Sequence, residues 1–223
     1  MHKLPEKLLA GYTDFLANRF NAERELYSRL ARQKQAPQTM VIACCDSRSA
    51  PETIFNAGHG ELFVLRNVAN LVPPFEPDGG QHGTSAAIEY AVTVLHVQNI
   101  LVMGHGNCGG IHAALNPDTS ASAMPHDFVT RWMNLLEPVT TQFPDNGLMT
   151  AGERQTILER ISIRNSISNL RTFPCVRELE RNGKLAVHGA WFDIGSGELW
   201  VMDADSGEFE RIDIPPADAP EST

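Results

Sequence analysis

Apolar residues recur along this chain with two different spacings, and the spacing changes from segment to segment. Between residues 6 and 33 they recur every three or four positions, which predicts a long amphipathic helix. Short continuous apolar runs predict buried strands at 39–44, 61–66 and 99–104. Helical spacing predicts further helices at 51–55, 84–97, 107–115, 128–139, 152–173 and 174–181, and a short helical turn at 67–71.

The final part of the chain has a different pattern. Residues 185–194 and 198–203 alternate between apolar and polar positions, and Gly195-Ser196-Gly197 between them is typical of a hairpin turn. The earlier strands alternate with helices, which favours right-handed crossovers and parallel pairing. We therefore expect an α/β protein: a mostly parallel sheet of about four strands, an antiparallel edge strand, helices on both faces and a long N-terminal helix.

A chain of 223 residues suits one domain with a sizeable core. We expect a single domain over residues 1–223, in which residues 1–34 form an N-terminal helical arm. Residues 116–123 are small and polar, which predicts a surface loop. The tail at 215–223 is rich in proline, alanine and acidic residues and is expected to be disordered.

Charge and composition exclude some classes of function. The net charge of −9 and the isoelectric point near 5.3 argue against a nucleic-acid partner, because phosphates are bound by lysine- and arginine-rich faces. No apolar run reaches the ~18 residues of a membrane span. The first residues lack a signal-peptide pattern, so we expect a cytoplasmic protein without a membrane partner. Four cysteines in a chain of this length are better explained as metal ligands or core thiols than as a disulfide framework.

The candidate chemistry follows two of the predicted strands. Cys44-Cys45-Asp46-Ser47-Arg48 comes at the end of 39–44, and His105-Gly106-Asn107-Cys108-Gly109-Gly110 follows 99–104. Ligands bind beyond the carboxyl ends of strands in open α/β sheets. Thiolate and imidazole are donors that zinc prefers. The two motifs therefore predict one Zn²⁺ site to which both contribute.

Side chains alternate along an extended segment, so only one of Cys44 and Cys45 can face a given metal. Periodicity leaves that choice open. A face carrying Cys44, Asp46 and Arg48 has a chemical logic, because Arg48 would fix the Asp46 carboxylate through two hydrogen bonds. Two thiolates and one imidazole would leave the fourth zinc position to water or to Asp46.

The remaining residues with reactive side chains receive simpler interpretations. Cys45 and Cys175 are expected to be small core thiols. His59 and His82 are expected in loops and are candidates for passing protons. The tryptophans are expected in the core or at an interface: Trp132, Trp191 and Trp200.

With these motifs the chain resembles the β-class carbonic anhydrases, in particular their plant-like subgroup. The similarity runs from about Gln35 to Leu115, returns at 185–203, and is carried by residues 43–48, 60–70, 87–92 and 104–110. The resemblance implies that Cys44, rather than Cys45, binds zinc together with His105 and Cys108. It also implies that Asp46 and Arg48 are a catalytic dyad, with Asp46 becoming a zinc ligand only in a closed state.

The resemblance further implies reversible hydration of CO2 to bicarbonate and a proton, by zinc-bound hydroxide that the dyad orients. The implied substrate-binding residues are Gln35, Phe63, Val68, Tyr90 and Gly109. A homodimer is the implied minimal unit, often within tetramers or larger assemblies, with the active cleft at the dimer interface and the N-terminal helix on the partner. The regulatory bicarbonate site of the other subgroup is expected to be absent, because Val41 stands where that subgroup has tryptophan.

Two alternatives remain at this stage. A similar zinc site and fold would support hydrolysis of carbonyl sulfide or carbon disulfide, and the motifs do not separate these substrates from CO2. A catalytically silent zinc protein is the second alternative. It is disfavoured because Asp46 and Arg48 are both present.

Overall fold

The computed structural model describes residues 4–116, 128–143 and 147–213, and the chain divides into two compact units, Met1–Ala36 and Pro37–Thr223. The predicted loop at 116–123, apart from Asn116, and the predicted disordered tail at 215–223 lie outside the described residues.

The first unit is helical, as its apolar spacing predicts. It consists of α1 (Glu6–Asp14), a π-helical segment η1 (Phe15–Phe20) and α2 (Arg24–Arg32). The rings of Phe15, Phe20 and Tyr27 lie against one another, with centroids 5.1–5.9 Å apart. None of the residues in these three helical segments is buried within the chain.

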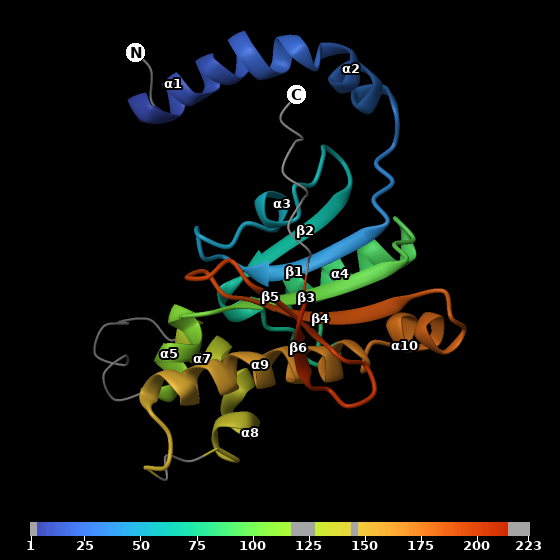
Figure 1. Cartoon of the computed structure of the whole chain (residues 1–223). Coiled ribbons are helices and arrows are strands. Elements are labelled where there is room, and N and C mark those ends of the chain that lie inside the picture. The colour runs from blue at the N-terminus through green and yellow to red at the C-terminus, as the bar shows by residue number, and fades with distance from the viewer. Residues whose placement is uncertain (1–3, 117–127, 144–146, 214–223) are drawn as a thin grey trace. The chain divides into compact units, whose positions relative to one another are not determined.

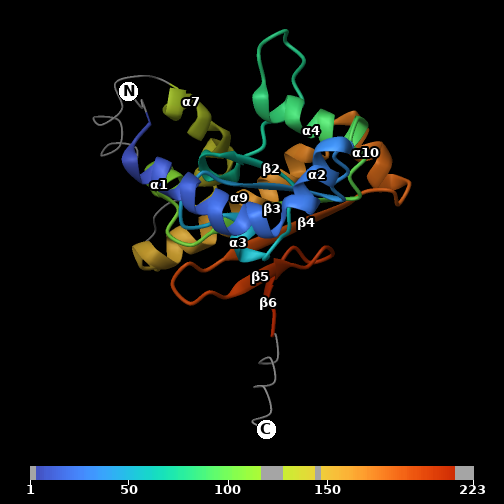
Figure 2. The same cartoon turned by 90° about the horizontal axis from the view of Figure 1, so that it is seen from above.

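The second unit is organised around a six-stranded sheet with the order β2-β1-β3-β4-β5-β6 (Figure 1). Four neighbouring strands are parallel: β2 (Leu62–Asn67), β1 (Thr39–Cys44), β3 (Asn99–His105) and β4 (Ala186–Phe192). β5 (Leu199–Met202) and β6 (Phe209–Arg211) are antiparallel and complete one edge, as Figure 2 shows. The predicted α/β class, the parallel sheet and the hairpin are confirmed.

β6 is the strand that the sequence pattern does not reveal. It has three residues, of which only Phe209 is buried. Such a run is too short to show alternation. A turn at Asp203–Gly207 brings it back beside β5, with Asp203 Oδ1 accepting from the Ser206 backbone N–H at 2.7 Å and Gly207 at φ +73°. The sheet therefore has two antiparallel edge strands where we expected one.

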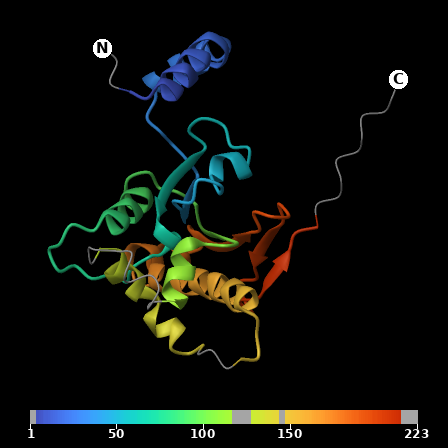
Figure 3. The same cartoon turned by 90° about the vertical axis from the view of Figure 1, so that its left-hand side faces the viewer.

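Helices cover the two faces of the sheet unequally. On one face, α4 (Gly83–Thr93), α9 (Ala151–Leu170) and α10 (Pro174–Arg181) pack on alternate strand residues such as Ile42 and Val102. On the other face lie Val41, Ala43, Met103 and Ala190, with Ile54 of the short helix α3 (Pro51–Ile54) packed against them. The expectation of helices on both faces is confirmed, with most of the helical mass on the α9 side (Figure 3).

α9 lies unusually close to the sheet where two strands carry glycine. A Cβ atom at Gly104 would lie 2.8 Å from Ile163 Cδ1, and one at Gly189 would lie 3.0 Å from Ile163 Cγ2. The helix begins with a capping box in which the Thr150 hydroxyl accepts from the Glu153 N–H and Glu153 accepts from the Thr150 N–H. This close packing places α9 directly against β3 and β4.

Shorter helical segments gather at the carboxyl ends of the strands. These are η2 (Val68–Asn70), α5 (Gly109–Leu115), α7 (Phe128–Met133), η3 (Asn134–Leu136) and α8 (Glu137–Thr140). The predicted helix at 128–139 is thus divided into three, and the one at 84–97 ends at Thr93, shortly before His96 adopts φ +55°. None of the helices in the described ranges combines the length and apolar character that a membrane span requires.

Candidate metal centre

The two predicted motifs meet at the carboxyl ends of β1 and β3. Cys44 is the last residue of β1, His105 is the last residue of β3, and Cys108 is the N-cap of α5. One potential ligand atom from each of the three lies within 4.8 Å of the others, and all three residues are buried. We call this group the candidate metal centre. The expectation that two segments far apart in sequence converge here is confirmed.

The geometry of the donors fits a tetrahedral ion. The sulfur atoms of Cys44 and Cys108 are 4.0 Å apart. Two sulfurs that each bind a tetrahedral zinc at ~2.3 Å would be about 3.8 Å apart. His105 Nδ1 lies 2.9 Å from the Gly106 carbonyl oxygen, to which it donates, so that Nε2 carries the free lone pair. Nε2 is buried, with no hydrogen-bond partner among the described residues.

The electrostatics of the two thiols also favour a cation. A hydrogen bond from Cys108 lowers the pKa of Cys44 to about 4, although burial opposes this shift. The adjacent Cys44 sulfur and burial raise the pKa of Cys108. The protein alone therefore stabilises one buried thiolate and disfavours the second. A bound cation would supply the positive charge that two thiolates require.

The Asp46–Arg48 pair has the geometry that its spacing predicts. Arg48 donates from Nε to Asp46 Oδ1 at 2.9 Å and from Nη2 to Oδ2 at 2.7 Å. Its backbone N–H also donates to Oδ1, at 3.0 Å. These contacts with Arg48 hold the pKa of Asp46 well below its usual range. Asp46 Oδ2 is 3.9 Å from His105 Nε2, so the ionised carboxylate borders the candidate metal centre while it remains tied to Arg48.

Arg66 is a supporting residue that the sequence motifs do not reveal. From β2 it donates to the carbonyl oxygens of Cys44, at 2.8 Å, and of Asp46, at 2.5 Å. β2 and β1 are adjacent parallel strands in which Ala43 pairs with Arg66. An arginine at the end of a strand beside a candidate ligand strand is the only sequence signal of this role.

The structure separates the two adjacent cysteines. Cys44 is buried, whereas Cys45 is exposed. The Cys45 backbone N–H donates to the Asn67 carbonyl, which continues the β1–β2 pairing and turns the Cys45 side chain away from Cys44. The interpretation of Cys45 as a core thiol is therefore wrong. Cys175 is partly buried and packs against the main core.

Two of the predicted substrate-binding residues lie near Cys108. A Cβ atom at Gly110 would be 3.0 Å from Val68 Cγ1, so Val68 lies directly against the start of α5, where Gly109 is exposed. The Trp132 indole N–H donates to the Val68 carbonyl at 2.8 Å. Ala69 follows at φ +62°. This arrangement holds Val68 with 37% of its surface exposed.

Two of the other predicted substrate-binding residues, Phe63 and Tyr90, are not brought to the candidate metal centre within the second unit. Phe63 pairs with Met40, four positions before the Cys44–Asn67 pair, which places it ~13 Å back along the strand. The Tyr90 ring lies beside it, with centroids 6.0 Å apart. Gln35 is an exposed residue of the first unit. The roles of these three residues remain predictions.

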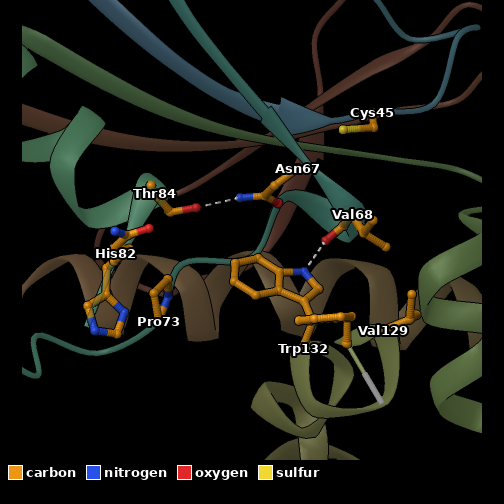
Figure 4. Close-up of a pocket in the computed structure, with 11 residues that line it drawn as sticks. Cys45, Asn67, Val68, Pro73, His82, Thr84, Val129 and Trp132 are labelled. Atoms are coloured by element: carbon orange, nitrogen blue, oxygen red, sulfur yellow. Dashed lines mark hydrogen bonds between the residues drawn. The ribbon is translucent and has the colours of Figure 1, made fainter. Parts of the chain in front are cut away.

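A cavity of about 610 Å³ lies on the Cys45 side of the strand ends (Figure 4). Its apolar lining includes Val68, Pro73, Val129 and Trp132, and Asn67 donates to Thr84 at its rim. His82 also lines it, with Nε2 2.6 Å from Asp78 Oδ1. His59 is half-buried elsewhere. Proton transfer by either histidine remains a prediction.

A mostly parallel sheet that presents a buried Cys-His-Cys group at its strand ends defines an α/β protein with a candidate metal site. The profile of the carbonic anhydrase family matches residues 39–199. The chain belongs to the β-carbonic anhydrase family and is a carbonic anhydrase, which is a lyase.

Individual relatives support this assignment. The chain is 36% identical to beta carbonic anhydrase 3 of Arabidopsis thaliana, over 89% of this chain and 77% of that protein. It is 35% identical to a carbonic anhydrase of Pseudomonas aeruginosa, over 92% and 90% of the two chains.

Solved structures agree. The β-carbonic anhydrase CcaA superposes with a TM-score of 0.86 at 28% identity, covering 94% of this chain and 92% of that one. A tetrameric β-carbonic anhydrase of Sordaria macrospora superposes with a TM-score of 0.78 at 29% identity, covering 89% and 96%.

Proposed function

We propose that this protein catalyses the reversible hydration of CO2 to bicarbonate and a proton, at a Zn²⁺ ion bound by Cys44, His105 and Cys108. The observation that carries the proposal is the convergence of these three buried donors within 4.8 Å at the strand ends of a carbonic anhydrase fold. Bound there, zinc would act as a Lewis acid that makes a water molecule acidic near neutral pH.

Asp46 and Arg48 would supply the orientation. The Asp46 carboxylate, held by two hydrogen bonds from Arg48, would accept a hydrogen bond from the reacting water and direct its oxygen toward CO2. Arg48 keeps that carboxylate ionised and fixes its direction. In a closed state Asp46 would instead become the fourth metal ligand, which requires its contacts with Arg48 to break.

The substrate pocket would need a second copy of the chain. Val68 and the Gly109 N–H lie beside Cys108, where they would contact CO2 and bicarbonate. Phe63 lies ~13 Å back along β2, with the Tyr90 ring of α4 beside it, beyond the reach of the same site. We infer that these two residues and Gln35 complete the pocket of a partner subunit. A homodimer, alone or within a tetramer, would be the active unit.

The first unit is suited to serve as an arm in such a dimer. Leu8 is 59% exposed and Tyr12 58% exposed, although both occupy apolar positions of α1. A helix with an exposed apolar face requires a covering surface. We propose that residues 1–34 extend a single functional domain and cover a second copy.

Stopped-flow measurement of CO2 hydration, with zinc analysis of the same sample, tests the proposal. We expect one zinc ion per chain and a rate of hydration that falls when zinc is removed and returns when it is restored. Zinc without hydration would favour the silent protein. Faster turnover of carbonyl sulfide or carbon disulfide on that sample would favour the alternative hydrolase.

A further inference from the structure

Side chains of α9 hold both peptide groups of Cys108. The Cys108 backbone N–H donates to Glu159 Oε1 at 2.9 Å. Gln155 Nε2 donates to the Cys108 carbonyl oxygen at 3.3 Å and to the same Glu159 oxygen at 3.1 Å. Residues four apart on a helix lie on one face, so Gln155 and Glu159 form a pair directed at a single residue. We call these two residues the α9 clamp.

The carboxylate of this clamp is a costly group to bury, which indicates a specific role. Glu159 is only 2% exposed. Its second oxygen, Oε2, accepts from the Trp191 indole N–H at 3.0 Å. Taking an ionised carboxylate out of water costs several kcal/mol unless hydrogen bonds compensate. Here all three hydrogen-bond neighbours are donors, a set that matches a carboxylate and no other common side chain.

Trp191 connects the α9 clamp to the loop between His105 and Cys108. Its indole comes within 3.2 Å of the position that a Cβ atom of Gly106 would occupy. The guanidinium of Arg160 lies over this ring, 4.7 Å from its centroid. The segment between His105 and Cys108 is therefore packed against Trp191, which itself donates to Glu159. One carboxylate thus links α9, β4 and the loop that carries two candidate ligands.

The clamp acts on the backbone of Cys108, whereas the Cys108 sulfur faces Cys44. Cys108 is the N-cap of α5, and its sulfur extends toward Cys44 while its N–H points to α9. A thiol on a freely rotating loop would lose conformational freedom when it binds a metal. A residue whose N–H and C=O are both bonded has already lost most of that freedom.

We propose that Glu159 and Gln155 are positioning residues that fix the backbone of Cys108, so that its sulfur is held ready to bind Zn²⁺ beside Cys44 and His105. This inference rests on the proposed function, because it takes Cys108 to be a ligand. It adds that affinity for the metal depends on a buried acid which touches neither metal nor substrate.

The test compares the wild-type chain with Glu159→Leu and Glu159→Gln, using Glu178→Gln, at an exposed position of α10, as the matched control for loss of a negative charge. Zn²⁺ affinity is measured by competition with a chelator. The sulfur-to-metal absorption bands of the Co²⁺-loaded proteins report thiolate coordination. We expect Glu159→Leu to weaken Zn²⁺ binding ~10–100-fold, as other changes behind metal ligands do, and to alter the Co²⁺ spectrum. Glu178→Gln should change neither.

The glutamine variant separates positioning from general folding. A glutamine has one acceptor oxygen, which would serve Cys108 and Gln155, and its amide would then face the Trp191 N–H, donor against donor. Glu159→Gln should therefore weaken Zn²⁺ binding less than Glu159→Leu does. Because Trp191→Phe removes the opposing donor, Glu159→Gln should also cost less affinity in that background than in the wild type.

Zn²⁺ affinities within twofold of the wild type for both Glu159 variants would overturn the proposal. So would a loss of thermal stability with an unchanged Co²⁺ spectrum, because that result describes a merely structural residue. These outcomes differ from failure of the proposed function, in which the wild type itself would bind no zinc or would not hydrate CO2.

Discussion

The ends of β1 and β3 each contribute residues to the candidate metal centre. The side chains that hold these residues in place come from different sequence separations at the two ends. At the end of β1, Asp46 is bonded by Arg48, two residues away, and the backbone is fixed by Arg66 on the neighbouring strand. At the end of β3, the bonds to Cys108 come from Glu159 and Gln155, which are 51 and 47 residues further along.

The two sets of contacts have different consequences for the site. The short-range contacts at β1 shape a reactive group, because they set the charge and direction of the Asp46 carboxylate. The long-range contacts at β3 shape a candidate ligand, because they bond the peptide groups of Cys108. Variants at the first end should therefore change turnover while metal remains bound, and variants behind the second should change metal binding first.

The largest effect should come from Cys44→Ser, which removes a proposed ligand on which both metal binding and turnover would depend. We expect Zn²⁺ affinity to fall by more than the ~10–100-fold that changes behind a ligand produce, with loss of CO2 hydration. Cys45→Ser is the matched control, since the Cys45 side chain is exposed and directed away. Metal analysis and stopped-flow hydration measure both. Equal effects of the two substitutions would refute the assignment of Cys44.

The next effect should come from Asp46→Asn, which tests the β1 end directly. We expect kcat for CO2 hydration to fall about 100-fold with zinc content unchanged, in the range that a positioned acid–base group contributes. Arg48→Lys should have a smaller effect, because it keeps the charge but loses the two-pronged contact with Asp46. If Asp46→Asn lost its zinc instead, the proposed division between the two ends would fail.

A smaller effect, on stability, should follow Gly110→Ala at the start of α5. The new methyl group would lie 3.0 Å from both Ala69 Cβ and Val68 Cγ1, and overpacking of this kind costs ~1–3 kcal/mol. Gly152→Ala is the control, because nothing lies within 4 Å of its Cβ position. The urea midpoints of the zinc-loaded proteins measure the difference. Equal urea midpoints would show that η2 moves to accommodate the methyl group without loss of stability.

The smallest effect should come from Thr150→Ala, which removes the capping box of α9. Loss of such a cap costs about 1 kcal/mol of stability. Because the cap lies more than two turns before Glu159, Zn²⁺ affinity should change much less than in Glu159→Leu. Thr150→Ser retains the hydroxyl and should behave as the wild type does. A large loss of affinity in Thr150→Ala would show that the clamp depends on the whole of α9.

The same contrast explains what the sequence could predict. The Asp46–Arg48 contact follows from spacing along one strand end, and convergence of Cys44, His105 and Cys108 follows from parallel strands that end side by side. The parallel strands and the hairpin are visible as apolar runs and alternation. Arg66 has only the weak signal of an arginine near a strand end, and Glu159 has no local signal, because each acts on a residue that only the fold brings near.

Other differences have local causes. β6 is too short for its alternation to be visible, and Cys45 is exposed because the β1–β2 pairing continues through its backbone. Phe63 and Tyr90 are a different case, since the resemblance assigns them to a cleft between two subunits, and their roles there remain predictions.

The two glycines beneath Ile163 have a mechanical consequence for the whole protein. Because Gly104 and Gly189 have no side chains, α9 packs close to the sheet. The distance between this helix and the sheet therefore depends on strand residues that take no part in the proposed reaction. A methyl group added at Gly189, on β4, would lie 3.0 Å from Ile163 Cγ2 and 3.1 Å from Ile167 Cδ1, so we expect it to displace side chains of the helix that also carries Glu159. The packing behind the candidate metal centre thus depends on the absence of side chains at two positions of the sheet.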